Sequence, residues 1–129
     1  MQTTLDTPAI SRNFTAILDS LSEKESIVIS RRMGLHGNKS TLQAIGDEFQ
    51  ITRERVRQIE ETAIRKIGRV TRSNNLFAIQ EIANNILAKA GGIMIRDDLV
   101  SMVAKEIATK DTSLLAIIEV LIQSDFNIE

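Results

Sequence analysis

Residues 41–60 read TLQAIGDEFQITRERVRQIE. The first half predicts a short helix over 42–49 that begins after Thr41 and carries its apolar side chains on one side. After a tight turn at 50–51, Thr52 is a good N-cap for a second helix, because its hydroxyl can accept from an unpaired backbone N–H. Two helices joined by a turn of about three to four residues form a helix-turn-helix, a unit common in DNA-binding proteins.

The second helix divides into an apolar and a polar face. Apolar residues recur at spacings of three and four, which marks them as the buried side: Val56, Ile59, Ala63 and Ile67. Long polar side chains must therefore project elsewhere: Arg53, Glu54, Arg57, Gln58 and Glu61. These residue types read base edges, since arginine bonds guanine, glutamate accepts from cytosine and glutamine bonds adenine. The amides and dipole of a helix N-terminus favour phosphate, and Arg55 and Arg57 suit the DNA backbone.

The polar face has a simpler interpretation as a solvated helix surface. Glu54 with Gln58, and Arg57 with Glu61, are pairs at i,i+4 that would stabilise the helix by only a few tenths of a kcal/mol. This interpretation leaves a cost unexplained, because three arginines at the start of the helix oppose its dipole. The sequence therefore favours contact with DNA.

Charge is distributed unevenly along the chain. The formal net charge is −1, yet residues 52–72 hold seven basic and three acidic side chains. Residues 73–129 hold four basic and eight acidic side chains. A short basic block is the pattern expected where a protein meets phosphate backbone, although a solvated helix face gives the same pattern.

Composition limits the classes of fold and function. The 129 residues include four aromatics, all Phe, one proline, no cysteine and a single histidine, His36. A chain poor in aromatics and proline favours an all-α fold. We expect no metal site, because cysteine is lacking and one histidine cannot build such a site. We also expect no cofactor, no small-molecule substrate and no enzymatic activity. Neither a leader nor a membrane-spanning run occurs, so we expect a cytoplasmic protein that binds no membrane.

Two helices precede the helix-turn-helix. Apolar residues over 10–21 repeat at spacings of three and four, which predicts a first amphipathic helix. Ser22 and Glu25 form a capping box that begins a second helix, which ends at Gly34. A polar loop over 34–40 then leads to the helix-turn-helix.

Four segments strongly resemble region 4 of bacterial primary sigma factors. They are Leu21–Glu25, Arg32–Gly37, Thr41–Gly46 and Thr52–Glu60. The resemblance implies a helix-turn-helix domain, which we assign to residues 1–72. Nothing in the chain resembles the family's aromatic-rich promoter-melting region, so the sequence is not that of a complete sigma factor. His36 stands in a loop where the family usually has Asp, and we expect it to be exposed to solvent.

The resemblance also implies roles for single residues. It implies that Arg53, Glu54 and Gln58 read bases of a minus-35-like promoter element in double-stranded DNA. The residues expected on the DNA backbone are Arg31, Arg32, Thr52, Arg55 and Arg57. The family's helix pair also clasps the flap tip of the RNA polymerase β subunit through an apolar groove. Candidates for that groove are Leu21, Ile27 and Ile29.

Residues 73–129 predict a second small domain of helices. An apolar stripe over 76–90 ends at Gly91–Gly92, and a short, strand-like apolar run follows at Ile93–Ile95. The order of elements is similar to a partial winged helix, the domain shared with the RNA polymerase delta subunit.

The rest of this domain is expected to be helical. Asp97 is expected to cap a helix that extends to residue 107, and residues 114–122 form a helix so apolar that it must be largely buried. We expect the stripe over 76–90 to pack on this apolar helix. The sequence stops at Phe126–Glu129, where a wing would start, so we expect it to be a fragment of a longer protein.

Two classes of function remain. The first is a sequence-specific DNA-binding transcription protein that reads a minus-35-like element, with RNA polymerase beside it. The second is a protein-interaction module that imitates sigma region 4 and binds the polymerase flap without reading DNA. The sequence favours the first, because a pure imitation has no physical need for the full set of base-reading and phosphate-binding side chains.

Overall fold

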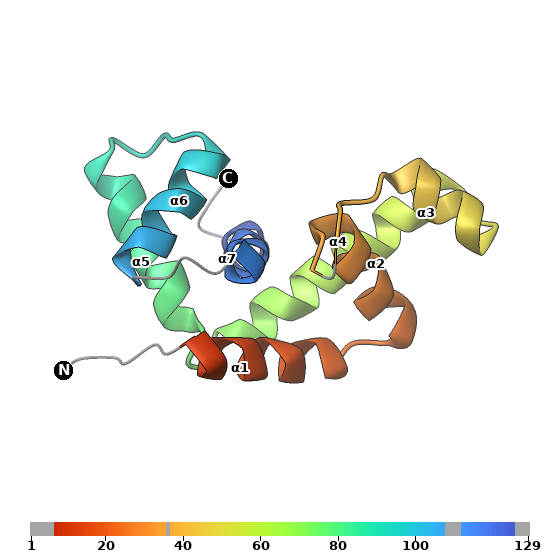
Figure 1. The fold of residues 1–129 in the computed structure, drawn as a ribbon, viewed down its shortest axis with the longest axis horizontal. Coiled ribbons are helices and arrows are strands. Elements are labelled where there is room, and N and C mark those ends of the chain that lie inside the picture. The colour runs from red at the N-terminus through yellow and green to blue at the C-terminus, as the bar shows by residue number, and fades with distance from the viewer. Residues whose placement is uncertain (1–6, 36, 108–111, 126–129) are drawn as a thin grey trace.

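The computed structural model describes residues 7–35, 37–107 and 112–125. Within them the chain forms seven α-helices and no β-strand, which confirms the all-α fold. In chain order the helices are α1 (Thr7–Asp19), α2 (Glu23–Met33), α3 (Leu42–Phe49), α4 (Arg53–Thr71), α5 (Phe77–Lys89), α6 (Arg96–Glu106) and α7 (Thr112–Gln123). Figure 1 shows α4 as a long diagonal rod above α1, with α2 and α3 near one end and α5, α6 and α7 on the other side.

The helix ends expected from capping residues are formed. Ser22 Oγ accepts from the Glu25 N–H at 3.2 Å, and the Glu25 carboxylate accepts from the Ser22 N–H at 2.9 Å. The second helix ends at Gly34, whose φ of 66° is a left-handed conformation that glycine adopts readily. Thr41 and Thr52 cap α3 and α4 through their hydroxyls. The predicted helix ends at Ser22, Gly34, Thr41 and Thr52 are therefore confirmed.

A tight turn joins α3 and α4. Gln50 ends α3 in the left-handed conformation, with φ of 58°, and its N–H donates to the Gly46 carbonyl. Gly46 allows this close approach, because a Cβ at that position would lie 2.6 Å from the carbonyl oxygen of Ile51. A small apolar cluster joins the two helices to α2: Val28, Ile45, Val56 and Ile59. The predicted helix-turn-helix is thus formed and is anchored from behind.

The main core lies around α7. This helix contacts α1, α2, α4, α5 and α6, and its residues Leu114, Ile118 and Leu121 are fully buried. The apolar stripe of α5 packs on α7 as expected, and Gln80 donates to the Leu121 carbonyl at 2.8 Å. A single cluster of buried residues includes helices from both sides of residue 72. The two predicted domains share this core, and the boundary between them stays a prediction.

Two contacts fix α7 against the helix-turn-helix half of the chain. Gly68 of α4 lies so close to the end of α7 that a Cβ would be 2.3 Å from the Ser124 carbonyl oxygen. Elsewhere along α7, Glu119 pairs with Lys39 from the loop before α3, with 3.1 Å between Nζ and the carboxylate. The missing side chain at Gly68 lets α7 cross α4 closely.

Two expectations for the second domain are wrong. Ile93–Ile95 form an irregular link and no strand, since no described segment pairs with them. α6 begins at Arg96 without a side-chain cap hydrogen bond, so Asp97 lies in the first turn and is not the cap. Its carboxylate there still complements the helix dipole. Two further expectations concern residues outside the described part: His36 and Phe126–Glu129.

Candidate nucleic-acid interface

The N-terminal end of α4 presents the residues predicted to read bases. Arg53, Glu54 and Gln58 are all exposed. On the opposite side of the same turns, Val56 is fully buried and Ile59 is 6% exposed. The structure therefore brings the three predicted base readers together at one exposed helix end, with the apolar cluster behind them.

Arg57 is held between two carboxylates of its own helix. Its Nε lies 3.0 Å from Glu54 Oε2, and its two remaining nitrogens pair with Glu54 and Glu61. The hydrogen bonds from Arg57 lower the pKa of the Glu54 carboxyl, and the charges of Arg57 and Arg53 add to this effect. In turn, the hydrogen bond to Glu54 and the charges of both carboxylates raise the pKa of Arg57. Arg57 therefore has two acidic partners on its own helix.

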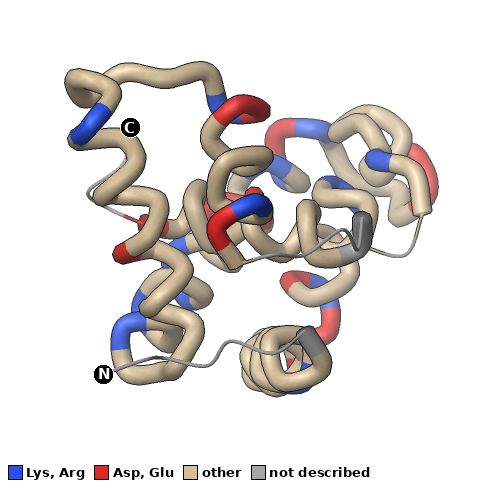
Figure 2. The backbone as a smooth tube through the Cα atoms, turned by 60° about the vertical axis from the view of Figure 1, so that its left-hand side comes forward, with Lys and Arg blue, Asp and Glu red and all other residues tan. Residues whose placement is uncertain are grey.

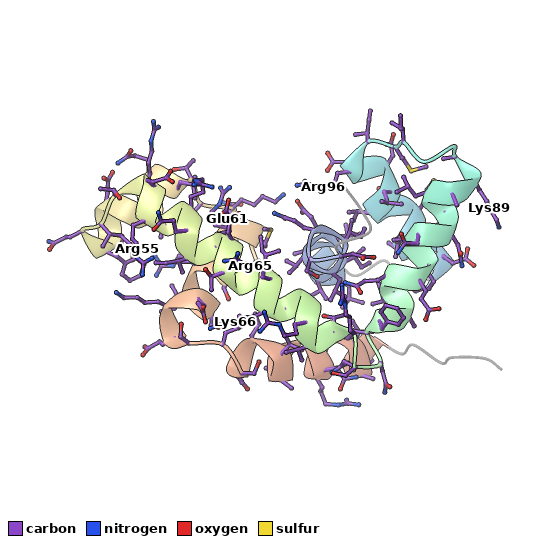
Figure 3. All side chains as sticks on the ribbon, turned by 180° about the vertical axis from the view of Figure 1, so that it is seen from behind. Arg55, Glu61, Arg65, Lys66, Lys89 and Arg96 are labelled. Atoms are coloured by element: carbon purple, nitrogen blue, oxygen red, sulfur yellow. The ribbon has the colours of Figure 1, made fainter. Side chains whose placement is uncertain are left out.

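The two other backbone candidates on α4 lie beside the base readers. Thr52 is exposed and uses its hydroxyl to cap the Arg55 N–H. Arg55 projects from the same helix end (Figure 3), and its Nη1 lies 3.4 Å from Gln58 Oε1. Gln58 thus pairs with Arg55, whereas the simple helix-surface interpretation pairs it with Glu54.

Arg31 and Arg32 have different environments, although they are adjacent in α2. Arg31 forms an ion pair with Glu48, and its guanidinium lies 5.3 Å from the centre of the Phe49 ring. Arg32 points inward, with Nε 2.6 Å from Glu60 Oε2 and Nη1 3.2 Å from the Ser40 carbonyl oxygen. Arg31 lies on the surface beside α3, whereas Arg32 ties α2 to α4 and to the loop before α3.

Sequence reasoning missed the partner of Arg32. Glu60 is 8% exposed, and it sits on α4 at the edge of the buried face that contains Ile59 and Ala63. Its position on the helix indicates burial. A buried carboxylate requires a cation or hydrogen-bond donors, so a partner for Glu60 was to be expected. No such signal in the sequence identifies Arg32 as that cation, since the two residues are 28 positions apart.

The groove candidates are mostly part of the core. Leu21 and Ile29 are buried in the same cluster as α7, with 8% and 0% exposure, whereas Ile27 is half-buried. Ile27 lines a shallow polar hollow together with Ser30 and Asn38. Two of the three side chains expected in a partner-binding groove are therefore covered by this chain itself.

Basic and acidic residues are mixed along the chain. Figure 2 shows blue and red positions interspersed along the backbone. The basic block of residues 52–72 is thus accompanied by carboxylates. Among the described residues, no three His, Asp or Glu side chains gather to hold a metal ion. Over the same residues, no helix has the length and apolar character needed to cross a bilayer.

Comparison with known proteins matches this part of the chain to one family. Residues 17–68, less than half of the chain, match the family described as Sigma-70, region 4. The match includes α2, α3, the turn after α3 and most of α4. No solved structure matches the chain with significance.

Similar curated proteins are RNA polymerase sigma factors. The chain is 48% identical over 65 residues to the sigma factor RpoD of Helicobacter pylori, a match that covers 45% of the chain and 10% of that protein. It is 46% identical over 61 residues to the sigma factor SigA of a Bacillus species, covering 46% of the chain and 16% of that protein. The chain thus spans a small part of these relatives. The homology supports a DNA-binding, sigma-like role in transcription for the matched segment.

Proposed function

We propose that this chain binds promoter DNA, reads a minus-35-like element with α4 and contacts RNA polymerase during transcription. The observation that carries the proposal is the exposed N-terminal end of α4, where Arg53, Glu54 and Gln58 lie together above buried Val56 and Ile59. Such an end can enter a major groove without loss of the core. Its proposed role is therefore binding, not catalysis.

The chemistry of this helix end suits both parts of a duplex. Arginine donates to guanine through two nitrogens, glutamate accepts from cytosine, and each good contact discriminates against a wrong base by about 1–3 kcal/mol. Thr52 and Arg55 lie at the same helix end, beside N–H groups that favour phosphate. We assign Arg53, Glu54 and Gln58 to bases, and Thr52 and Arg55 to the backbone.

The alternative is a module that binds the polymerase flap and leaves DNA unread. It needs an open apolar groove at Leu21, Ile27 and Ile29. Burial of Leu21 and Ile29 in the main core argues against this use of the groove, because both side chains are already covered by this chain. The exposed base-reading set has no purpose in this alternative, so DNA binding is the better-supported function.

A binding assay with duplex DNA tests the proposal. Fluorescence anisotropy would compare a duplex with a minus-35-like element and a scrambled duplex over a range of salt concentrations. Arg53→Ala should weaken binding to the first duplex by about 1–3 kcal/mol and flatten its preference at one base pair. Arg12→Ala, an exposed arginine on α1, is the matched control for loss of one charge. Equal affinity of the unmutated chain for both duplexes would overturn sequence-specific reading.

A further inference from the structure

The carboxylate of Glu61 occupies a special position on α4. It lies one turn beyond Arg57, as Glu54 lies one turn before it, and both pair with the same guanidinium. Figure 3 shows Glu61 on α4 between Arg55 and Arg65, beyond the helix end that carries the base readers. The three paired side chains together carry one positive and two negative charges, so this part of the proposed DNA face has a net charge of −1.

A phosphate group competes for the same guanidinium. Carboxylate and phosphate oxygens both accept two parallel N–H bonds from arginine, so either can occupy Arg57. The Arg57, Glu54 and Glu61 side chains are 46%, 59% and 57% exposed, which leaves the cluster open to a DNA strand. Exposed pairs of this kind are weak, and phosphate could displace one of them. A phosphate near Arg57 would, however, also lie near Glu61, whose charge repels it.

We propose that Glu61 is a specificity-determining residue of the DNA interface. Its carboxylate occupies Nη1 of Arg57, to which a DNA phosphate would otherwise bind. This inference rests on the proposed DNA binding. One phosphate contact fewer lowers affinity for every duplex, whatever its sequence. Arg57 meanwhile stays on Glu54 and orients that carboxylate toward the bases. Glu61 thus raises the ratio of specific to non-specific binding, and Arg57 acts as a positioning residue.

Substitution of the carboxylate by an amide tests the inference on the full chain. Glu61→Gln should strengthen binding to a scrambled duplex by about 3- to 10-fold at low salt and steepen the salt slope by about one unit. Nη1 of Arg57 then reaches phosphate, while Nε and Nη2 stay on Glu54. Binding to the minus-35-like duplex should improve less, so the specificity ratio falls. Glu81→Gln, an exposed glutamate on α5, makes the same change in net charge and should alter neither affinity.

A double variant isolates the role of Arg57. Compared with Arg57→Ala, the double variant Arg57→Ala/Glu61→Gln should keep only the small gain on scrambled DNA that comes from lost charge repulsion, because no guanidinium is left to release. The inference is overturned if Glu61→Gln behaves like Glu81→Gln, or if the full gain survives without Arg57. Those results would leave the proposed function standing, since the unmutated chain would still prefer the minus-35-like duplex. Failure of the unmutated chain to bind any duplex would instead overturn both.

Discussion

Replacing Gly68 by alanine should weaken the docking of α7 on α4. The added Cβ would lie 2.3 Å from the Ser124 carbonyl oxygen and 3.3 Å from the carbonyl carbon, both backbone atoms that cannot rotate away. The end of α7 must therefore move until the first distance exceeds 3.0 Å, the lower limit for real Cβ contacts. This movement disturbs the point where the two halves of the core meet.

Opposing energies set the size of the effect. Overpacking typically costs about 1–3 kcal/mol. Gln80 also donates to the Leu121 carbonyl at 2.8 Å and to Ser124 Oγ at 3.3 Å, and loss of either bond would cost about 1 kcal/mol. Against this, alanine favours a helix over glycine by about 1 kcal/mol. We expect a net decrease of about 1–3 kcal/mol in the free energy of unfolding.

Urea unfolding followed by far-ultraviolet circular dichroism measures this change, since the chain has no Trp or Tyr. Gly37→Ala is the control, because a Cβ at that position meets no atom within 4 Å, and its stability should stay within about 0.5 kcal/mol of the unmutated chain. A Gly68→Ala variant that is as stable as the unmutated chain, or more stable, would show that α7 does not cross α4 at this residue. The slope of the denaturant dependence should stay unchanged, as expected for a change of stability alone.

Two further predictions concern ion pairs that join distant parts of the chain. Arg32→Ala should lower the free energy of unfolding by about 1–3 kcal/mol, because it leaves the Glu60 carboxylate buried without its cation. Thermal melting measures this change, and an unchanged melting midpoint would contradict the pairing. Burial acts to raise the pKa of Glu25, but the cap hydrogen bonds and Lys66 outweigh it and hold that pKa below the usual 4.5. The stabilisation from Glu25 is therefore complete above about pH 4.5 and is lost as the pH falls through the lowered pKa. Unfolding measured from pH 6 to about pH 3 should show a smaller loss for Glu25→Gln than for the unmutated chain, and equal losses would remove Glu25 as a source of acid sensitivity.

Much of the local structure could be predicted from the sequence. The caps at Ser22, Thr41 and Thr52 and the helix end at Gly34 depend on hydrogen bonds between residues at most four to five positions apart. The exposed base-reading end of α4 was also predictable, because periodic apolar residues identify the buried side of a helix and leave the opposite side to solvent. The roles of its residues toward DNA stay predictions.

The tertiary structure alone decided which buried sides meet. Arg32 looks like a surface cation in the sequence, yet its partner Glu60 is supplied by another helix. The run Ile93–Ile95 has the composition of a strand, but a strand requires a neighbour for its hydrogen bonds, and no described segment provides one. The periodicity of apolar residues predicts that one face of a helix is buried, but it does not identify the residues that bury it. Close approach of Gly68 to Ser124, and with it the shared core around α7, depends on the packing of side chains far apart along the chain.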